Sequence, residues 1–417
     1  MLRIIHSRER QALEALFERR ASRMGKAEAT VAPILEAVRK RGDRALVGYA
    51  KKLDGLIAAS VRITPRDLRR AKRSLSNEFL SAVETASRQI RQFAELQLPT
   101  GWMKTLRPGI ELGQLVRPLE SIAAYIPGGR YPLPSTVMMT VIPAQVAGVK
   151  TISVASPRPS AETLGTAALL GVKNVFHMGG AQAIAAFAFG TETVPKADRI
   201  VGPGNIYVAA AKKLLAGEVG IDFVAGPTEI LLISDDGDPR HLAADMLAQA
   251  EHDVDAAAIL LTTNSTLAQA VAEQVEVQLK GLTTRKVAAA AILTNSAIVV
   301  TRSIEEACEI SNSFAPEHLS ISESVPLEKI EHAGSIFIGA WSPEAAGDYA
   351  SGPNHVLPTS GTARLRGGLS VLDYVKIISV QKLSEKGLRS LAPAITTLAR
   401  AEGLEAHARS IEVRTGG

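Results

Sequence analysis

The chain has 417 residues, of which 46% are hydrophobic, so it can bury a large core and is long enough for two domains with extensions. Its 47 basic and 42 acidic residues are spread along the whole length, and the resulting charge of +5 is too dilute to indicate a polyanion-binding protein by itself. The apolar runs contain polar breaks and fall short of the roughly 20 residues that a membrane-spanning helix needs, so we expect no membrane span. With a single cysteine, Cys308, and no signal pattern in "MLRIIHSRERQ", we expect a cytoplasmic protein without internal disulfides.

Residues 1–119 are predicted to form a helical region. Apolar residues recur every three or four positions in "RERQALEALFERRASR" and in "NEFLSAVETASRQIRQFAELQ". Between these segments lies a basic cluster in "PRDLRRAKRSL", made of Arg66, Arg69, Arg70, Lys72 and Arg73. Such a cluster allows a nucleic-acid-binding interpretation, but aromatic residues for base stacking make up only 4% of the chain, and a solvated helix face is the more usual reason for it.

From about residue 120, short apolar runs alternate with helix-like segments. The runs have the length of buried strands: "KTISVASP" (150–157), "VKNVFHMGG" (172–180), "DFVAGPTEILLISD" (222–235), "AAAILLTT" (256–263) and "AGSIFIGA" (333–340). This alternation is typical of parallel sheets with helices on both faces. We therefore predict an α/β fold with two Rossmann-like parallel-sheet domains, 120–235 and 236–369, followed by a mostly helical tail, 370–417.

Three glycine-rich turns lie where predicted strands lead into helices. They are "YIPGGRYPLPS" (125–135), "HMGGAQAIAAFAFG" (177–190) and "VGPGNIYVAAAKK" (201–213). Ligands of parallel α/β sheets bind where strands end, and glycine lets backbone N–H groups approach a pyrophosphate at a helix N-terminus. None of the turns has the complete G-x-G-x-x-G pattern, so they allow a dinucleotide or phosphate ligand as well as a purely structural role.

The segment "LAQAEHD" (247–253) places Gln249 and His252 three residues apart, on the same side of a helix. This spacing allows half of a metal site, although a polar helix face would look the same. In "FAPEHLSI", Glu317 and His318 adjoin at an element boundary, where a carboxylate and an imidazole can carry out acid–base chemistry. A surface pair without a role is the alternative.

Two further segments carry candidate polar groups. The loop "GDYASGPNHVLPTSGTARL" (347–365) holds Asp348 and His355; long polar loops of this kind often carry function, although a well-ordered connection without function is an equal alternative. The segment "AEGLEAHARSI" (401–411) places Glu402 and His407 near the C-terminus. Cys308 is surrounded by glutamates that should raise its pKa, so we expect a buried structural thiol and no thioester chemistry.

Taken together and in this order, several segments resemble histidinol dehydrogenases. They are "VGPGNIYVAAAKKLLAGEVGIDFVAGPTEILLISD", "AQAEHD", "FAPEHL", "GDYASGPNHVLPTSGTAR" and "EGLEAHARSI", and the resemblance runs from about residue 120 to 412. It implies an aldehyde-dehydrogenase-like architecture, with residues 1–119 packed on the second α/β domain and the tail exchanged across a homodimer. It also implies an enzyme that uses zinc and NAD to oxidise L-histidinol through L-histidinal to L-histidine, the last two steps of histidine biosynthesis.

The resemblance also implies roles for particular residues. One Zn²⁺ per subunit is expected at Gln249, His252, Asp348 and His407, and the partner subunit is expected to supply His407 together with Glu402. The same residues, with Thr228 and His318, are expected to bind substrate, while Glu317 and His318 are the expected acid–base pair. Contacts to NAD are expected at one residue of each glycine-rich turn: Tyr125, Gln182 and Asn205.

One position departs from the family pattern. The family's "AGPSE" is "AGPTE" here, so Thr228 keeps the hydroxyl and adds a methyl group. An alternative is therefore a related zinc- and NAD-dependent dehydrogenase that acts on another polar alcohol, such as a sulfonated propanediol. The basic nucleic-acid-binding protein remains a more distant alternative.

The implied chemistry is consistent with these residue types. A zinc ion held by two neutral histidines, one glutamine and one aspartate keeps a net charge near +1, and it favours the unprotonated nitrogens of histidinol. We expect His318 to accept the alcohol proton, because an ordinary imidazole pKa near 6.5 suits a base. We expect Glu317 to activate the water that hydrates the aldehyde.

Overall fold

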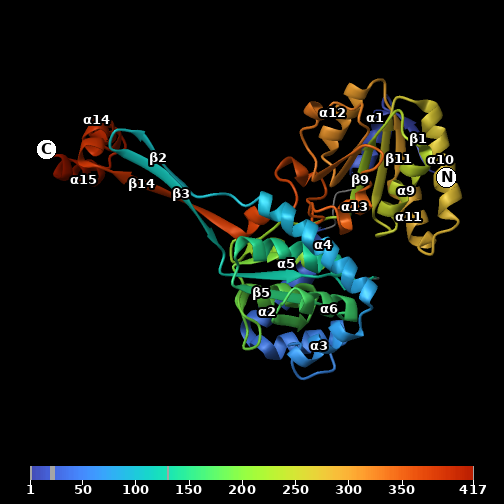
Figure 1. Ribbon diagram of the computed structural model, residues 1–417, viewed down its shortest axis with the longest axis horizontal. Helices are drawn as coiled ribbons and strands as arrows, with labels where there is room; N and C mark the ends of the chain where they lie inside the picture. The colour runs from blue at the N-terminus through green and yellow to red at the C-terminus, as the bar shows by residue number, and fades with distance from the viewer. Residues whose placement is uncertain (1, 19–23, 129–130, 417) are drawn as a thin grey trace.

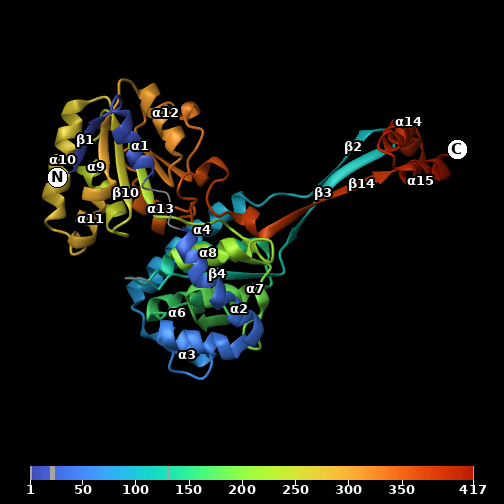
Figure 2. The same ribbon diagram turned by 180° about the vertical axis from the view of Figure 1, so that it is seen from behind.

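The computed structural model describes residues 2–18, 24–128 and 131–416, which form two α/β lobes and a long arm (Figure 1). The first lobe is built on a five-stranded sheet and the second on a six-stranded sheet, while the arm carries a three-stranded sheet. Figure 2, from behind, shows the same arm projecting away from the two lobes, with the C-terminus at its far end. Among the described residues, no helix has both the length and the apolar character needed to cross a bilayer.

The first lobe contains a parallel sheet with strand order β6-β5-β4-β7-β8. Side chains of β4 alternate between the two faces, so Ala123 and Tyr125 pack on one side and Ile122 and Ala124 on the other. The strands are β4 (Ser121–Tyr125), β5 (Thr151–Ser156), β6 (Asn174–His177), β7 (Arg199–Val201) and β8 (Gly220–Ile221). The helices between them are α5 (Pro134–Ala147), α6 (Ala161–Leu169), α7 (Gly180–Phe189) and α8 (Ile206–Leu215).

The N-terminal helices pack mainly on this first lobe. Helix α2 contacts α7 and α8 on one face of the sheet, while α3 contacts α6 and α4 contacts α5 on the other. These elements are α2 (Met24–Tyr49), the π-helix η1 (Ala50–Asp54), α3 (Pro65–Ser74) and α4 (Asn77–Leu96). The expectation that residues 1–119 pack on the second α/β domain is therefore wrong for α2 to α4, because their apolar stripes complete the two cores of the first lobe.

The second lobe contains a parallel sheet with strand order β1-β11-β10-β9-β12-β13. Strand β9 is buried on both faces: Ile230 and Leu232 meet α9 to α11, and Leu231 and Ile233 meet α1 and α12. The strands are β1 (Arg3–His6), β9 (Glu229–Ile233), β10 (Ala257–Thr262), β11 (Ala297–Val300), β12 (His318–Ile321) and β13 (Ser335–Ile338). The helical elements are α1 (Arg10–Glu18), α9 (Pro239–Ala250), α10 (Ser265–Leu279), α11 (Arg285–Asn295), α12 (Ile304–Phe314), η2 (Leu327–Lys329) and α13 (Glu344–Tyr349).

The arm joins two segments that are far apart in the sequence. Strands β2 (Trp102–Arg107), β3 (Ile110–Pro118) and β14 (Val375–Leu383) form an antiparallel sheet in the order β14-β3-β2. Helices α14 (Glu385–Ala401) and α15 (Glu405–Thr415) follow at its end, after two short 3-10 helices nearer the lobes, η3 (Thr362–Arg364) and η4 (Val371–Tyr374). Residues 102–118, expected to belong to a helical region, instead form β2 and β3, because these strands pair with each other and the distant β14 pairs along β3.

The prediction of an α/β fold with two parallel-sheet units and helical terminal parts is confirmed. Four of the five predicted strands appear near their expected bounds, as β5, β6, β10 and β13. The fifth, 222–235, is a strand only over Glu229–Ile233, because its first half is the connection that leads from β8 of the first lobe to β9 of the second.

Candidate functional site

A cavity of about 250 Å³ lies between the two lobes. Its walls include Pro127 after β4 and Gly204 after β7, both at the carboxyl edge of the first sheet. In that sheet the chain runs outward from β4 in one direction and from β7 in the other, which makes this edge the switch point where open α/β sheets bind ligands. The opposite wall includes Thr228, Glu317 and His318, which stand at the amino edge of the second sheet, directly before or at the start of β9 and β12.

The three glycine-rich turns follow β4, β6 and β7 and lead to α5, α7 and α8, as predicted. Tyr125 ends β4, and its hydroxyl accepts a hydrogen bond from the Gly180 N–H at 3.1 Å. Asn205 caps α8 by accepting from the N–H groups of the second and third residues after it. Gln182 lies in the first turn of α7 and is buried. Gly129 and Arg130 of the first turn lie outside the described residues.

A buried ion pair fixes the turn after β7. The Lys212 ammonium donates to Asp222 Oδ1 and to the Gly202 carbonyl, each at 2.6 Å, while Asp222 Oδ2 accepts from the Gly202 N–H at 2.8 Å. Both charged side chains are almost completely buried, so each depends on the other for its solvation. Their contacts hold both polar groups of the Gly202 backbone where the turn leads to Asn205.

Glu317 is positioned by the connection that enters β9. Its Oε2 accepts from the Thr228 hydroxyl at 2.6 Å and from the Glu229 N–H at 2.9 Å. Burial raises the pKa of this carboxyl, although the neighbouring His318 and these two hydrogen bonds oppose the shift. Ala315, at φ 50°, ends α12 in a left-handed conformation and directs the chain through Pro316 into the Glu317–His318 pair.

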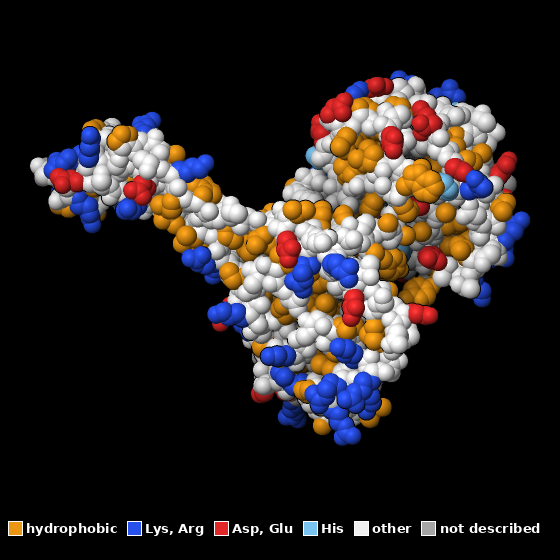
Figure 3. Space-filling view, in the orientation of Figure 1, with side chains coloured by type: hydrophobic (Ala, Val, Ile, Leu, Met, Phe, Trp, Pro, Cys, Tyr) orange, Lys and Arg blue, Asp and Glu red, His pale blue; other side chains and the backbone are white. Residues whose placement is uncertain are grey.

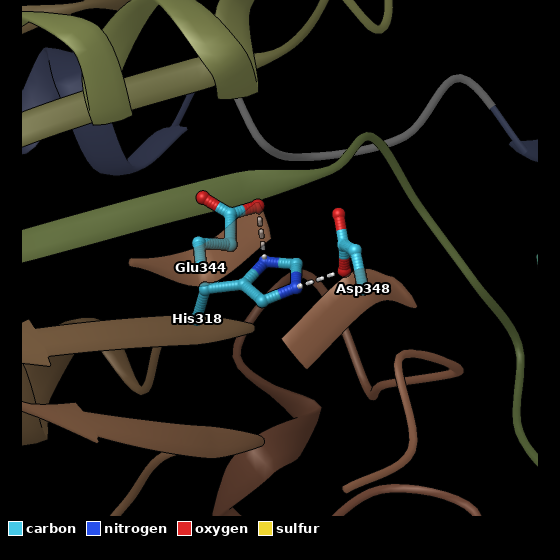
Figure 4. A group of neighbouring side chains, drawn as sticks. All are labelled: His318, Glu344 and Asp348. Carbon is cyan, nitrogen blue, oxygen red and sulfur yellow. Dashed lines mark ion pairs between the residues drawn. The ribbon is translucent and has the colours of Figure 1, made fainter. Parts of the chain in front are cut away.

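His318 lies between carboxylates, as Figure 4 shows. Its Nδ1 lies 3.2 Å from the Glu229 carbonyl and 3.5 Å from Glu344 Oε1, and its Nε2 lies 3.7 Å from Asp348 Oδ1. Burial alone would lower the His318 pKa, but Glu344, Glu317 and Asp348 outweigh it and raise the pKa to about 10. The expectation of an ordinary pKa near 6.5 is therefore wrong for the metal-free protein, because three acidic groups surround the ring.

The carbonyl contact selects the tautomer of a neutral His318. A proton on Nδ1 is held by the Glu229 carbonyl, which leaves the lone pair on Nε2. That Nε2 is buried and has no hydrogen-bond partner within the described part of the chain. A neutral His318 would thus present an unoccupied acceptor to a substrate hydroxyl.

Three of the four predicted zinc ligands come from one region of the second lobe. Gln249 is buried in the last turn of α9, His252 follows this helix, and Asp348 lies on α13. His252 Nδ1 lies 3.0 Å from the Ala248 carbonyl, so its Nε2 is left to face Asp348 Oδ2 at 4.0 Å. Two ligands of one zinc ion, each at about 2.0–2.2 Å, can span this separation, and a ligating histidine is usually held through its other nitrogen in this way.

A second arrangement of possible ligands overlaps the first only at Asp348. The ligand atoms of His318, Glu344 and Asp348 lie within 4.8 Å of one another. Burial would raise the Asp348 pKa, but the adjacent His318 outweighs it and keeps that pKa below its usual value. Asp348 is therefore an ionised oxygen donor at neutral pH in either arrangement.

Glu344 is a site residue that the sequence analysis did not single out. Burial raises its pKa to about 8, although the neighbouring His318 opposes this shift, and its carboxyl accepts from the Gln249 side-chain nitrogen. The Gln249 amide oxygen then accepts from the Glu229 N–H, and it lies 2.6 Å from the Thr228 hydroxyl, which also lies 2.6 Å from Glu317 Oε2 and can donate to it. The i, i+4 spacing of Glu344 and Asp348 would have indicated one helix face, but 347–365 was taken as a loop, whereas α13 extends to Tyr349.

His355 does belong to the cavity wall. Its Nδ1 lies 2.8 Å from the Asp348 carbonyl and its Nε2 3.2 Å from the Thr136 hydroxyl, which links the loop after α13 to α5 of the first lobe. Burial lowers the His355 pKa, so this ring is neutral at physiological pH. We infer that it connects the two walls rather than carrying charge.

Glu402 and His407 are not brought to this cavity within one chain. Glu402 is the C-cap of α14 and His407 lies on α15, both exposed at the far end of the arm (Figure 1). The arm has its own cavity of about 750 Å³, lined mainly by leucine and isoleucine between its sheet and α14 and α15. That cavity lacks the acid–base groups that the cavity between the lobes contains.

Two further expectations concern residues away from the cavity. Cys308 is buried on α12, and burial is the main reason that its pKa is raised, with the neighbouring glutamates as a smaller cause. The basic cluster lies on α3 with its five cationic side chains exposed. In Figure 3 these blue side chains gather at the lower end of the first lobe, away from the cavity.

The sequence and the structure were compared with known proteins. The family described as histidinol dehydrogenase matches residues 17–415. The histidinol dehydrogenase of Syntrophotalea carbinolica is 47% identical over 413 residues, covering 97% of this chain and 96% of that protein. The histidinol dehydrogenase of Halalkalibacterium halodurans is 48% identical over 390 residues, covering 91% of this chain and 92% of that protein.

A solved structure is similar along nearly the whole chain. The crystal structure of histidinol dehydrogenase from Elizabethkingia anophelis has a TM-score of 0.95 and 39% sequence identity, and the similarity covers 99% of this chain and 98% of that chain. Sequence and structure therefore agree over both lobes and the arm, and the chain belongs to the histidinol dehydrogenase family of oxidoreductases.

Proposed function

We propose that this enzyme oxidises L-histidinol through L-histidinal to L-histidine, with two NAD reduced for each histidinol and one Zn²⁺ in each site. The observation that carries this proposal is the acid–base pair Glu317–His318 in the wall that faces the carboxyl edge of the first sheet. When bound, NAD would accept hydride, and zinc at Gln249, His252, Asp348 and His407 would orient the substrate nitrogens. The single, buried cysteine keeps the cytoplasm as the expected compartment.

In the first oxidation we assign the base to His318. The Glu229 carbonyl holds the proton of Nδ1, so Nε2 can take the proton of the substrate alcohol. This role requires a neutral ring, whereas the three surrounding carboxyl groups favour the charged ring in the metal-free protein. A divalent cation beside Asp348 would oppose those carboxyl groups and restore a base.

In the second oxidation we assign water activation to Glu317. The Thr228 hydroxyl and the Glu229 N–H both donate to Oε2. Neither of them donates to Oε1, so Oε1 is the oxygen that can receive a proton from water. Addition of that water to the aldehyde would give a hydrate, with the proton that His318 took in the first oxidation returned to the carbonyl oxygen. His318 would then be free to take a hydroxyl proton from the hydrate when the cofactor accepts hydride. Cys308 is buried on α12 with a raised pKa, so no thioester route is assigned.

We further propose a homodimer in which the arm supplies Glu402 and His407 to the partner's site. Strand β2 is exposed along its whole length, and most of β14 is exposed as well. Large apolar side chains remain uncovered on these strands, among them Trp102, Met103 and Ile377. A second copy of the chain would cover this surface and would bring the two residues to the cavity that lacks them.

The test is to count NADH formed per L-histidinol before and after treatment with a chelator. We expect two NADH per histidinol, loss of activity on chelation, and recovery with Zn²⁺. A sulfonated propanediol is tested in parallel, because Thr228 differs from the serine of the family pattern. No NADH from histidinol, together with turnover of the diol, would refute the proposed substrate while keeping the enzyme class.

A further inference from the structure

A buried carboxylate from the N-terminal region holds the start of α7. Asp54, the last residue of η1, is 4% exposed. Its Oδ2 accepts from the Gly179 N–H at 2.9 Å and from Gln182 Nε2 at 3.0 Å. Gly55, at φ 71°, ends the π-helix immediately afterwards, and the Asp54 carbonyl lies 3.1 Å from His177 Nε2 at the end of β6, which holds the carboxylate beside the turn.

These contacts decide how the Gln182 amide is oriented. Because its nitrogen is bound to Asp54, its oxygen must point the other way. Gln182 Oε1 is buried and has no hydrogen-bond partner within the described residues. A Cβ atom on Gly180 would lie 3.0 Å from this oxygen, so the glycine keeps the approach to it open.

The same turn is bound to Tyr125. The Tyr125 hydroxyl accepts from the Gly180 N–H, and burial raises its pKa to about 12, so its own proton remains available to a ligand. The side chains of Asp54 and Tyr125 thus accept hydrogen bonds from two neighbouring backbone N–H groups, those of Gly179 and Gly180, just after β6. The result is one acceptor, Gln182 Oε1 at the start of α7, and one donor, the Tyr125 hydroxyl from the end of β4, both at the turn after β6.

We propose that Asp54 is a positioning residue for the dinucleotide, which fixes Gln182 so that Oε1 accepts a hydrogen bond from an O–H or N–H of the bound cofactor. A buried amide oxygen without a hydrogen-bond donor is unfavourable, so a ligand donor that satisfies it gains affinity. The inference rests on the proposed use of NAD. It adds that a residue of the N-terminal helical region, outside both sheets, determines NAD affinity.

The chain offers a matched control at the other end of α7. Asp43 of α2 accepts from the Thr191 hydroxyl at 2.5 Å and from the Thr193 N–H at 3.3 Å, just beyond the end of α7. It is also an N-terminal carboxylate that docks on the first lobe, but it makes no contact with Gln182 or the turn at Gly179. Asp43→Asn therefore reports what loss of such an anchor does to the fold alone.

The experiment measures binding of NAD and NADH to the zinc-loaded enzyme by equilibrium titration, using NADH fluorescence and competition by NAD, with no turnover. Asp54→Asn keeps the shape but loses the charge that strengthens both hydrogen bonds. We expect its Kd for NAD to rise at least fivefold, with histidinol binding unchanged within twofold. Asp43→Asn is expected to lower the melting temperature and leave the NAD Kd within twofold of wild type.

A double-mutant cycle separates positioning from general damage. If Asp54 acts through Gln182, Asp54→Asn adds little to the loss of NAD affinity already caused by Gln182→Met. Additive losses, an unchanged Kd in Asp54→Asn, or an equal loss in Asp43→Asn would overturn the inference. Wild-type enzyme that binds no NAD would overturn the proposed function as well. If Asp54→Asn does not fold, Asp54→Ser replaces it, with the same outcomes.

Discussion

The Thr228 hydroxyl is the contact whose removal tests the assigned role of Glu317 most directly. Thr228→Val replaces the hydroxyl by a methyl group of similar size, so the pocket keeps its shape. Glu317 Oε2 loses a hydrogen bond of 2.6 Å and keeps only the Glu229 N–H. A hydrogen bond to a charged group contributes about 1.5–3 kcal/mol. At about 1.4 kcal/mol per tenfold, kcat for L-histidinal oxidation should fall roughly 10- to 150-fold.

Thr228→Val should also shift the pH dependence of the reaction, and the change in the Glu317 pKa gives the direction of that shift. The Thr228 hydrogen bond lowers the pKa of Glu317 against the effect of burial, so its loss lets that pKa rise further. A general base with a higher pKa is protonated over more of the acid range, so the acid limb of kcat/KM should move to higher pH. Steady-state rates with L-histidinal from pH 5 to 10 measure both quantities.

Thr228→Ser is the control, because it keeps the hydroxyl and removes only the methyl group. We expect it to retain the wild-type acid limb and most of the wild-type kcat. Wild-type rates in Thr228→Val, or an equal loss in Thr228→Ser, would show that this hydroxyl does not tune Glu317.

Three further predictions use other parts of the site. Glu317→Gln should slow oxidation of L-histidinal at least tenfold more than oxidation of L-histidinol in single-turnover assays; equal losses would contradict the division of roles between Glu317 and His318. Inactive His407→Ala subunits mixed with inactive His252→Ala subunits should recover up to about a quarter of wild-type activity. Half of the subunits pair as heterodimers, and each heterodimer has one intact site out of two. No recovery in heterodimers verified by mass would argue against a shared site. Asp245 lies on α9, and burial raises its pKa to about 6, so its contribution to stability is present below about pH 4 and is lost as the pH rises through about 6. Asp245→Asn should therefore stabilise the chelator-treated protein at pH 7 by at most about 3 kcal/mol and not at pH 4, as measured by urea unfolding; an equal gain at both pH values would refute this linkage.

The geometry of the cavity explains why the groups that we propose as catalytic stand at strand starts. In the first sheet the glycine-rich turns follow the carboxyl ends of β4 and β7, as is usual for a nucleotide site. The second sheet presents its amino edge to the same cavity, so Thr228 precedes β9 and His318 begins β12. A ligand held by the first lobe is therefore met by acid–base groups from the second, and His355 joins the two walls through Thr136.

The sequence alone determined the local elements and the candidate groups. Alternation of short apolar runs with helical segments predicted two parallel sheets, because a strand buried on both faces is a nearly continuous apolar run, as β9 after Glu229 and β10 before Thr262 are. Glycines at strand ends predicted the turns that carry Tyr125, Gln182 and Asn205. The order of short polar motifs indicated the family, which the comparisons confirm.

Only the tertiary structure decided which distant side chains meet. Local periodicity says that α2 to α4 are amphipathic, but not which sheet they cover, because either lobe could bury the same apolar stripe. The pKa of His318 likewise depends on burial, which no local pattern reports, and on the carboxyl groups of Glu344 and Asp348. These two residues lie on α13, which follows β13 in the chain, and the fold brings them beside His318. Asp54 binds Gln182 across 128 positions of sequence for the same reason: hydrogen bonds and charges act over ångströms in space, whereas sequence patterns record only neighbours along the chain.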